Sequence, residues 1–172
     1  MLLDLSRFRT ASENIERRID PGAFAADTSD FRVVGPVDFA ADVRKDHEKV
    51  RLVGRVKTTL ELNCSRCLEP FQIPVDAPFD VMFLPISANT GETDGETPAD
   101  DLGVSYYRDD TIDLTEVVRE QFYLALPMKP LCEPDCRGLC PVCGINRNRD
   151  TCNCQTAWVD PRLAPLRALK KS

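Results

Sequence analysis

The chain has 172 residues, a length typical of one domain or of one domain with a small appendage. Hydrophobic residues make up 42% of it, enough for a buried core, and no stretch approaches the ~18 apolar residues of a membrane-spanning helix. The net charge of -6 argues against a generic nucleic-acid-binding surface, because affinity for phosphate depends on clustered Lys and Arg.

The first 30 residues show no continuous hydrophobic period. Residues 14–18 are expected to form a short helix, which the breaker Asp20-Pro21-Gly22 ends. Asp4 stands where a secretory signal peptide would be apolar, so we expect a cytoplasmic protein without a membrane partner.

From Phe31 onward, hydrophobic and polar residues alternate with a period of two, the pattern of half-buried strands. The alternation runs over residues 37–43, resumes over 52–62 after a polar turn, and continues over 71–83 with a break at Ala77-Pro78. Three long strands joined by short connections predict an antiparallel meander, or a partly closed sheet.

A second group of elements follows the meander. Residues 87–103 are polar and acidic and are expected to form a mobile loop, and residues 104–107 to add a strand. Asp113 and Glu116 have the spacing of a capping box, which predicts the start of a helix. The residues of its apolar face recur at helical spacing: Leu114, Val117, Val118, Phe122 and Ala125.

Pro127 and Pro130 end this helix and lead into a cysteine-rich segment. The predicted fold class is therefore α+β, with a sheet and one packed helix over residues 1–127. Residues 128–172 form a cysteine-rich appendage, in which Asp160-Pro161 is expected to start a short basic helix.

Six of the eight cysteines fall between residues 132 and 154, and Cys64 and Cys67 form a further pair. Thiolates with two residues between them can chelate one ion, because a tight turn directs both sulfurs to the same point. The single histidine, His47, is distant in sequence, so a metal would be held by sulfur alone, which favours Zn²⁺. Disulfides, an iron–sulfur cluster and metal-free thiols are the alternatives.

Two pairings of the ligands are open. In the first, the cysteines nearest the C-terminus form a local site: Cys140, Cys143, Cys152 and Cys154. The remaining cysteines then form a second site or none: Cys64, Cys67, Cys132 and Cys136. In the second pairing, the Cys64/Cys67 and Cys140/Cys143 turns join as in a zinc ribbon and attach the C-terminal segment to the sheet.

A closed four-thiolate zinc site leaves no open position for a reacting water. The sequence also contains no Gly-rich phosphate loop, no nucleophile elbow and no histidine-based general base. We therefore expect no enzyme, no catalytic residues and no small-molecule substrate.

The charge is distributed unevenly along the chain. Residues 128–172 contain eight basic and four acidic residues, a balance of +4, whereas residues 1–127 contain fourteen and twenty-four, a balance of -10. The C-terminal segment is therefore the candidate surface for RNA, unless its charges form an ordinary solvated face. The candidate RNA-binding residues are Arg147, Arg149, Arg167, Lys170 and Lys171.

Several motifs resemble those of one family: Cys64-Ser65-Arg66-Cys67-Leu68, Leu126-Pro127-Met128-Lys129-Pro130-Leu131-Cys132, Asp135-Cys136-Arg137-Gly138-Leu139-Cys140-Pro141-Val142-Cys143-Gly144 and Asp160-Pro161-Arg162-Leu163. Over roughly residues 30 to 169, the chain resembles the YceD family, which is named for supporting accumulation of the large-subunit ribosomal RNA. No family pattern is expected in the acidic insert at residues 87–101.

The resemblance implies a non-enzymatic ribosome biogenesis factor that supports synthesis, processing or accumulation of the large-subunit (23S) ribosomal RNA. Its partner would be pre-ribosomal RNA or a large-subunit ribosomal protein. The alternative is a protein–protein adaptor, whose acidic sheet domain recruits a basic ribosomal protein without touching RNA.

Overall fold

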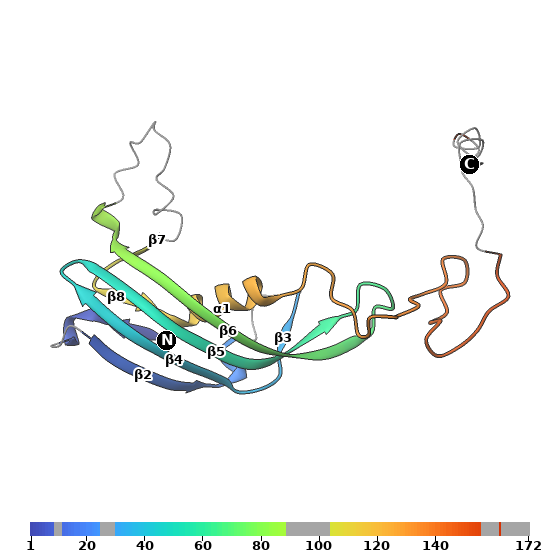
Figure 1. Cartoon of the computed structure of the whole chain (residues 1–172), viewed down its shortest axis with the longest axis horizontal. Helices are drawn as coiled ribbons and strands as arrows, with labels where there is room; N and C mark the ends of the chain where they lie inside the picture. The colour runs from blue at the N-terminus through green and yellow to red at the C-terminus, as the bar shows by residue number, and fades with distance from the viewer. Residues whose placement is uncertain (9–11, 25–29, 89–103, 156–161, 163–172) are drawn as a thin grey trace, which may run out of the picture. The chain divides into compact units, whose positions relative to one another are not determined.

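The computed structural model describes residues 1–8, 12–24, 30–88, 104–155 and 162 (Figure 1). Most of the acidic loop expected over 87–103, and the short basic helix expected after Asp160, lie outside these residues. The chain divides into two compact units. The first contains Met1–Leu62 and Phe71–Met128, and the second contains Asn63–Pro70 and Lys129–Ser172.

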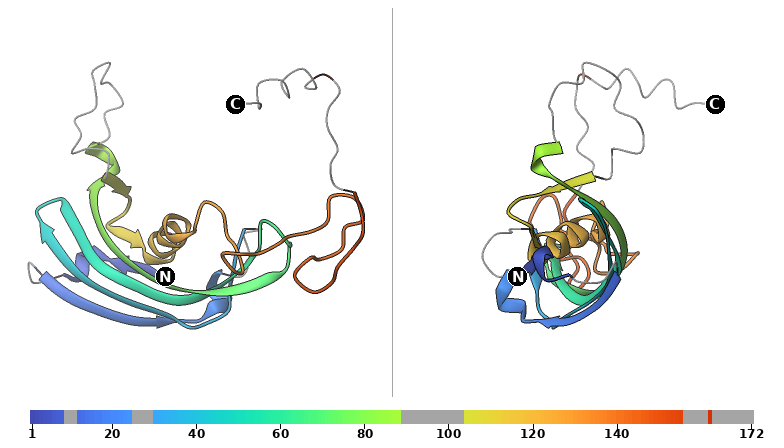
Figure 2. Two further views of the ribbon diagram at one scale, coloured as in Figure 1. Left: turned by 45° about the vertical axis from the view of Figure 1, so that its right-hand side comes forward. Right: turned by 90° about the vertical axis from the view of Figure 1, so that its left-hand side faces the viewer.

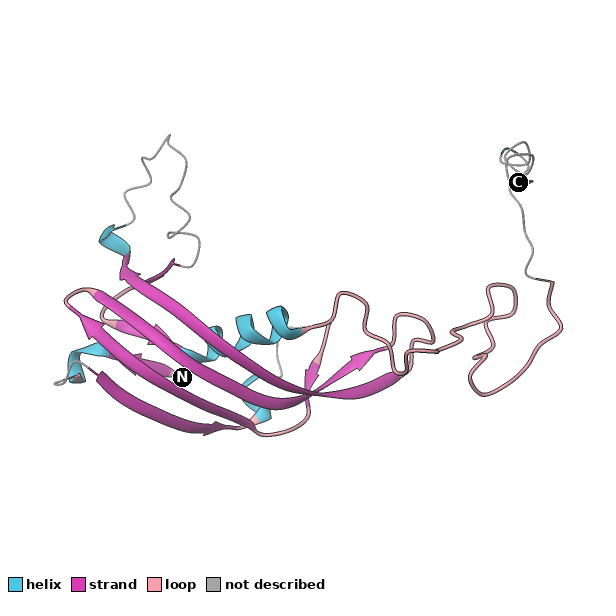
Figure 3. Ribbon diagram, viewed as in Figure 1, coloured by secondary structure: helices cyan, strands magenta, loops and turns pink. Residues whose placement is uncertain are grey.

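The first unit is built on a sheet with the strand order β2-β4-β5-β6-β7, in which β3 also pairs with β5 (Figure 3). The bounds are β2 Ser12–Ile19, β3 Arg32–Val33, β4 Val37–Asp46, β5 Lys49–Asn63, β6 Pro70–Pro85 and β7 Val104–Tyr107. A separate antiparallel pair joins β1 (Leu2–Asp4) to β8 (Thr111–Asp113). Three short 3₁₀ turns complete the unit: Leu5–Arg7, Pro21–Phe24 and Ile86–Ala88.

The three long strands predicted by the alternation are confirmed as β4, β5 and β6, and the strand expected at residues 104–107 is β7. Strand β4 pairs antiparallel with both β2 and β5. Strand β7 instead runs parallel to β6, with Met82 opposite Val104. The long connection between β6 and β7 allows this direction, since a parallel neighbour needs more chain than a tight hairpin supplies.

The prediction of a helix over residues 14–18 is wrong, because this segment lies in β2. Ile15 and Ile19 are four residues apart, a spacing that puts them on one face of a helix and equally on one face of a strand. Pairing with β4 decides between the two. Ile15 lies opposite Ala41, Ile19 lies opposite Val37, and both isoleucines are buried.

The helix predicted after Asp113 is confirmed as α1 (Leu114–Ala125), which lies inside the curve of the sheet (Figure 2). The Asp113 carboxylate accepts a hydrogen bond from the Thr115 N–H at 2.8 Å and so caps the first turn. Phe122 is fully buried and makes an edge-to-face contact with Phe24, with ring centroids 5.4 Å apart. The apolar face of α1 thus closes the core of the first unit.

Gly54 in β5 leaves the space that an aromatic pair fills. A Cβ atom at this position would collide with the Ala40 carbonyl oxygen and would lie 2.7 Å from the ring of Phe79. Phe79 stacks on Phe39 with ring centroids 5.6 Å apart, and both rings are buried. Only glycine permits this approach of strand and ring.

Exposed side chains of opposite charge on β5 and β6 form ion pairs. Arg51 Nε lies 2.8 Å from Asp80 Oδ1, and Arg55 Nη1 lies 3.0 Å from Asp76 Oδ1. The hydrogen bond and charge of the Arg51 guanidinium lower the pKa of Asp80. Within the residues that the structure describes, no helix has the length and apolar character needed to cross a membrane.

Candidate metal centres

The eight cysteines of the second unit gather into two groups of four. Site A consists of Cys64, Cys67, Cys132 and Cys136, and site B consists of Cys140, Cys143, Cys152 and Cys154. Within each group all four sulfurs lie within 4.8 Å of one another. Such an arrangement suggests metal binding, because each group offers four thiolates to a common centre.

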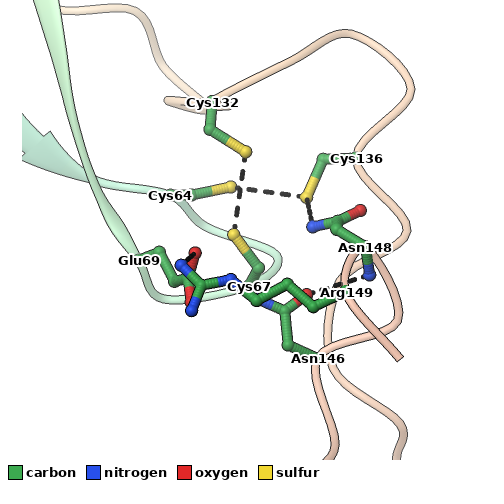
Figure 4. Close-up of polar contacts among 8 residues, drawn as sticks. All are labelled: Cys64, Cys67, Glu69, Cys132, Cys136, Asn146, Asn148 and Arg149. Carbon is green, nitrogen blue, oxygen red and sulfur yellow. Dashed lines mark hydrogen bonds and ion pairs between the residues drawn. The ribbon is translucent and has the colours of Figure 1, made fainter. Parts of the chain in front are cut away.

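The sulfur separations in site A match a tetrahedral metal site. Cys64 Sγ lies 3.7 Å from Cys136 Sγ, and Cys67 Sγ lies 3.7 Å from Cys132 Sγ (Figure 4). Four sulfurs placed tetrahedrally at the zinc–sulfur distance of ~2.3 Å are separated by roughly 3.8 Å. Disulfide sulfurs would be about 2.05 Å apart, and all eight cysteines are free in the structure.

Each site contains one cysteine turn with the same backbone hydrogen bonds. In site A, the Leu68 N–H donates to the Cys64 carbonyl oxygen at 2.9 Å, and the Cys64 N–H donates to that of Glu69 at 2.9 Å. In site B, the Gly144 N–H donates to the Cys140 carbonyl oxygen at 2.9 Å, and the Cys140 N–H to that of Ile145 at 2.8 Å. These bonds close the two turns and hold both sulfurs of each turn on one side.

The turns also direct backbone N–H groups at the first sulfur of each pair. Donation by the N–H groups of Cys143 and Val142 lowers the pKa of the Cys140 thiol to about 6. Burial raises the pKa of Cys64, but N–H donation led by Cys67 outweighs burial and brings it to about 6. Hydrogen bonds to the charged form of a thiol favour the thiolate, which is the form that binds a metal.

Site A joins chain segments that are far apart in sequence. Cys64 and Cys67 belong to the connection between β5 and β6, whereas Cys132 and Cys136 follow α1 by several residues. The Ser65 N–H donates to the Pro130 carbonyl oxygen at 2.8 Å and aligns the two segments. Cys64, Cys67 and Cys136 are almost fully buried, so site A is a closed centre.

Two polar side chains contact Cys136 of site A, and Figure 4 shows one of them, Asn148. Asn148 Nδ2 donates to Cys136 Sγ at 3.2 Å, and Arg66 Nη1 donates to the Cys136 carbonyl oxygen at 2.8 Å. The sequence analysis did not identify Asn148 as a functional residue. Its one signal is its place between two pairs of site B cysteines, which does not indicate contact with site A.

Site B is local and more accessible to solvent. Its four cysteines come from residues 140–154, Cys143 is exposed, and Cys152 and Cys154 are half-buried. The residues between its two cysteine pairs fold back onto the preceding segment, where Leu139 and Asn146 form an isolated β-bridge. The Arg147 N–H also donates to the Gly138 carbonyl oxygen at 2.9 Å. This loop therefore lies between the two cysteine pairs of site B and packs on the segment before them.

The geometry distinguishes between the two pairings left open by the sequence. The sulfurs of Cys64 and Cys67 lie with those of Cys132 and Cys136, and those of Cys140 and Cys143 lie with Cys152 and Cys154. The ribbon pairing would require Cys64, Cys67, Cys140 and Cys143 to share one centre, and they do not form such a group in the structure.

The candidate RNA-binding residues are only partly described. Arg147 is exposed, whereas Arg149 is engaged by Glu69, with Arg149 Nη2 2.8 Å from Glu69 Oε2. Arg167, Lys170 and Lys171 lie outside the described residues. Arg147 and Arg149 therefore lie on the same loop, between the two cysteine pairs of site B. Of the two, Arg149 is the one that pairs with a carboxylate.

The comparisons with known proteins identify a family. The family model described as large ribosomal RNA subunit accumulation protein YceD matches residues 52–170. An uncharacterised protein of Mycobacterium tuberculosis is 33% identical over 130 residues, which cover 76% of this chain and 60% of the relative. The chain thus spans about 60% of the length of this curated relative.

Two further relatives come from a plant and a bacterium. The chloroplastic large ribosomal RNA subunit accumulation protein YCED homolog 1 of Zea mays is 28% identical over 167 residues, covering 79% of this chain and 54% of the relative. The uncharacterised protein YlbN of Bacillus subtilis is 31% identical over 147 residues, covering 83% of this chain and 79% of the relative. No solved structure matches the chain significantly.

Proposed function

Because the chain belongs to the YceD family of large ribosomal RNA subunit accumulation proteins, we propose that it is a non-enzymatic factor in biogenesis of the large ribosomal subunit. The match of the family model over residues 52–170 is the observation that carries this proposal. The two groups of thiolates support the non-catalytic part, because a metal with four protein ligands has no open position for a substrate or water.

The proposed metal is Zn²⁺, with all eight cysteines as ligands of two structural sites. Thiolate-only donor sets suit zinc, and the 3.7 Å sulfur separations fit its tetrahedral bond length. Among the described residues, the second unit has no regular helix and no strand of its own beyond the ends of β5 and β6. Metal binding is therefore its main source of folding free energy.

The proposed partner is pre-ribosomal RNA, contacted by exposed arginines on the metal-bound loops. Arg137 and Arg147 lie on adjacent segments, joined through the Gly138 carbonyl and the Asn148 side chain. Among the residues that the structure describes, neither guanidinium forms a hydrogen bond or an ion pair. Arg149, in contrast, is neutralised by Glu69. Exposed guanidinium groups are available for phosphate without first breaking an ion pair.

The charge balance favours a second candidate, an adaptor that binds a basic ribosomal protein. A Zn²⁺ ion with four thiolates carries a net charge of -2, so two such sites would make the whole chain more acidic by four charges. The acidic surplus of residues 1–127, a balance of -10, remains. An acidic surface of this kind steers a basic protein and repels RNA.

Co-purification with ribosomal particles tests both candidates. The proposal expects the tagged protein to be recovered with precursors of the large subunit, and RNase treatment to release it if RNA is the partner. Retention on a ribosomal protein after RNase treatment supports the adaptor. Absence from large-subunit precursors under both conditions contradicts the biogenesis role.

A further inference from the structure

Asn148 connects the two cysteine groups. It belongs to the loop between Cys143 and Cys152, two ligands of the proposed site B, yet its Nδ2 donates to the sulfur of Cys136 in site A at 3.2 Å (Figure 4). A single side chain thus belongs to the loop closed by one centre and contacts a ligand of the other.

The orientation of the Asn148 amide is determined by its other partner. Asn148 Oδ1 accepts a hydrogen bond from the Arg137 N–H at 2.7 Å. A backbone N–H can only donate, so the oxygen of the amide must face Arg137, and the NH₂ group is left to face the sulfur. The Asn148 backbone is itself fixed, since its N–H donates to Asn146 Oδ1 at 3.0 Å.

Further contacts hold the same loop, and the segment before Cys140 that pairs with it, against the segments that carry site A. The Arg149–Glu69 ion pair reaches the cysteine turn of site A, and the Leu139 N–H donates to the Arg66 carbonyl oxygen at 3.1 Å. Gly138, with φ +70°, permits this approach, because a Cβ there would lie 3.0 Å from that same oxygen. Loss of site B would leave only these contacts to hold Asn148 against Cys136.

We propose that Asn148 is a positioning residue that couples the two metal sites, so that metal bound at site B strengthens metal binding at site A. The inference rests on the proposed occupation of both sites. An N–H donor stabilises a metal-bound thiolate, and metal at site B would fix both ends of the loop from which Asn148 donates. Because such coupling is reciprocal, metal at site A must strengthen site B by the same factor.

The test is a double-mutant cycle on the full chain, with Zn²⁺ retention at site A as the readout. Asn148→Asp keeps the oxygen that accepts from the Arg137 N–H. It replaces the NH₂ group that donates to Cys136 Sγ with a second carboxylate oxygen, which cannot donate. Cys152→Ser/Cys154→Ser removes site B. Competition with a chromophoric chelator gives the affinity of site A directly where site B is removed. Where both sites are present, native mass spectrometry of the zero-, one- and two-zinc forms gives two stepwise affinities, and Cys64→Ser/Cys67→Ser, which removes site A, shows which of them belongs to site B.

Asn148→Asp alone is expected to lower the zinc affinity of site A by about 10- to 100-fold, the usual effect of losing an outer-shell partner. Loss of site B should lower it similarly, and Asn148→Asp should add little in that background. Gln72→Glu is the control, since it makes the same charge change on an exposed residue of β6, outside both cysteine groups, and should leave site A unchanged.

Two other results would overturn the coupling. One is an equal effect of Asn148→Asp with and without site B, and the other is an affinity of site A that does not respond to Asn148→Asp. A spectroscopic readout separates a general loss of structure from the lost donor. With Co²⁺ as the probe, the sulfur-to-metal charge-transfer band of site A should move to lower energy in Asn148→Asp. If the unaltered protein retains no zinc, the proposed metal sites fail, independently of the coupling.

Discussion

Leu68 and Gly144 occupy the same position in two copies of one turn. Each follows the second cysteine of its pair, each donates its N–H to the carbonyl oxygen of the first cysteine at 2.9 Å, and each has a positive φ, 62° and 74°. Glycine enters this left-handed region readily, whereas other residues carry a cost of roughly 1–2 kcal/mol. Leu68 is 64% exposed, so burial of its side chain does not offset this cost.

Leu68→Gly should therefore stabilise the second unit by about 0.5–1 kcal/mol, because the relieved strain exceeds the added entropy of the unfolded chain. The measurement is resistance of the zinc-loaded protein to chelator-induced unfolding. Gly144→Ala is the reciprocal variant and should destabilise by about 1 kcal/mol, through backbone strain alone, since nothing lies within 4 Å of the added Cβ. A loss of stability in Leu68→Gly would show that the leucine side chain has a role that outweighs its strain.

Gly54→Ala should destabilise the first unit by about 1–3 kcal/mol, since the added methyl group collides with the Ala40 carbonyl oxygen and the Phe79 ring. The shift in the urea midpoint at constant slope measures this loss. Gly35→Ala is the control, because its Cβ would lie 3.3 Å from Thr59 and needs only a small adjustment. Equal midpoints for the two variants would contradict the proposed role of Gly54.

Removal of zinc should unfold the second unit and leave the first unit folded. The sheet and α1 bury their own apolar core, whereas the described part of the second unit depends on its two proposed metal sites. Hydrogen exchange should show lost protection around Cys64 and over residues 132–154, with protection retained in β4 and α1. Restoration of protection by added Zn²⁺ is the control. Loss of protection throughout the sheet would show that the two units unfold together.

Arg137→Gln and Arg147→Gln should weaken RNA binding and flatten its salt dependence. Each lost phosphate contact should reduce the slope of log affinity against log salt by roughly 0.7 to 0.9. Arg149→Gln removes the same charge but starts from an arginine paired with Glu69, so its effect should be smaller. Equal affinities and slopes for all three variants and the unaltered protein would favour the adaptor role.

Local pattern was sufficient where neighbouring residues determine the structure. The period of two predicted β4, β5 and β6, and the apolar spacing after Asp113 predicted α1. The paired cysteines likewise indicated turns in which the two sulfurs lie together, because two residues between thiolates suffice for this. Each of these features depends on contacts within one short segment or on a repeated alternation.

Tertiary structure decided the features for which the local pattern allows two outcomes. The spacing of Ile15 and Ile19 fits either a helix or a strand, and only pairing with β4 selects the strand. Each cysteine turn supplies two of the four sulfurs of its group, so the partners of Cys64 and Cys67 depend on which distant segment the fold brings beside them. The contact between Asn148 and Cys136 has the same origin, because a hydrogen bond between two loops leaves no periodic trace in the sequence.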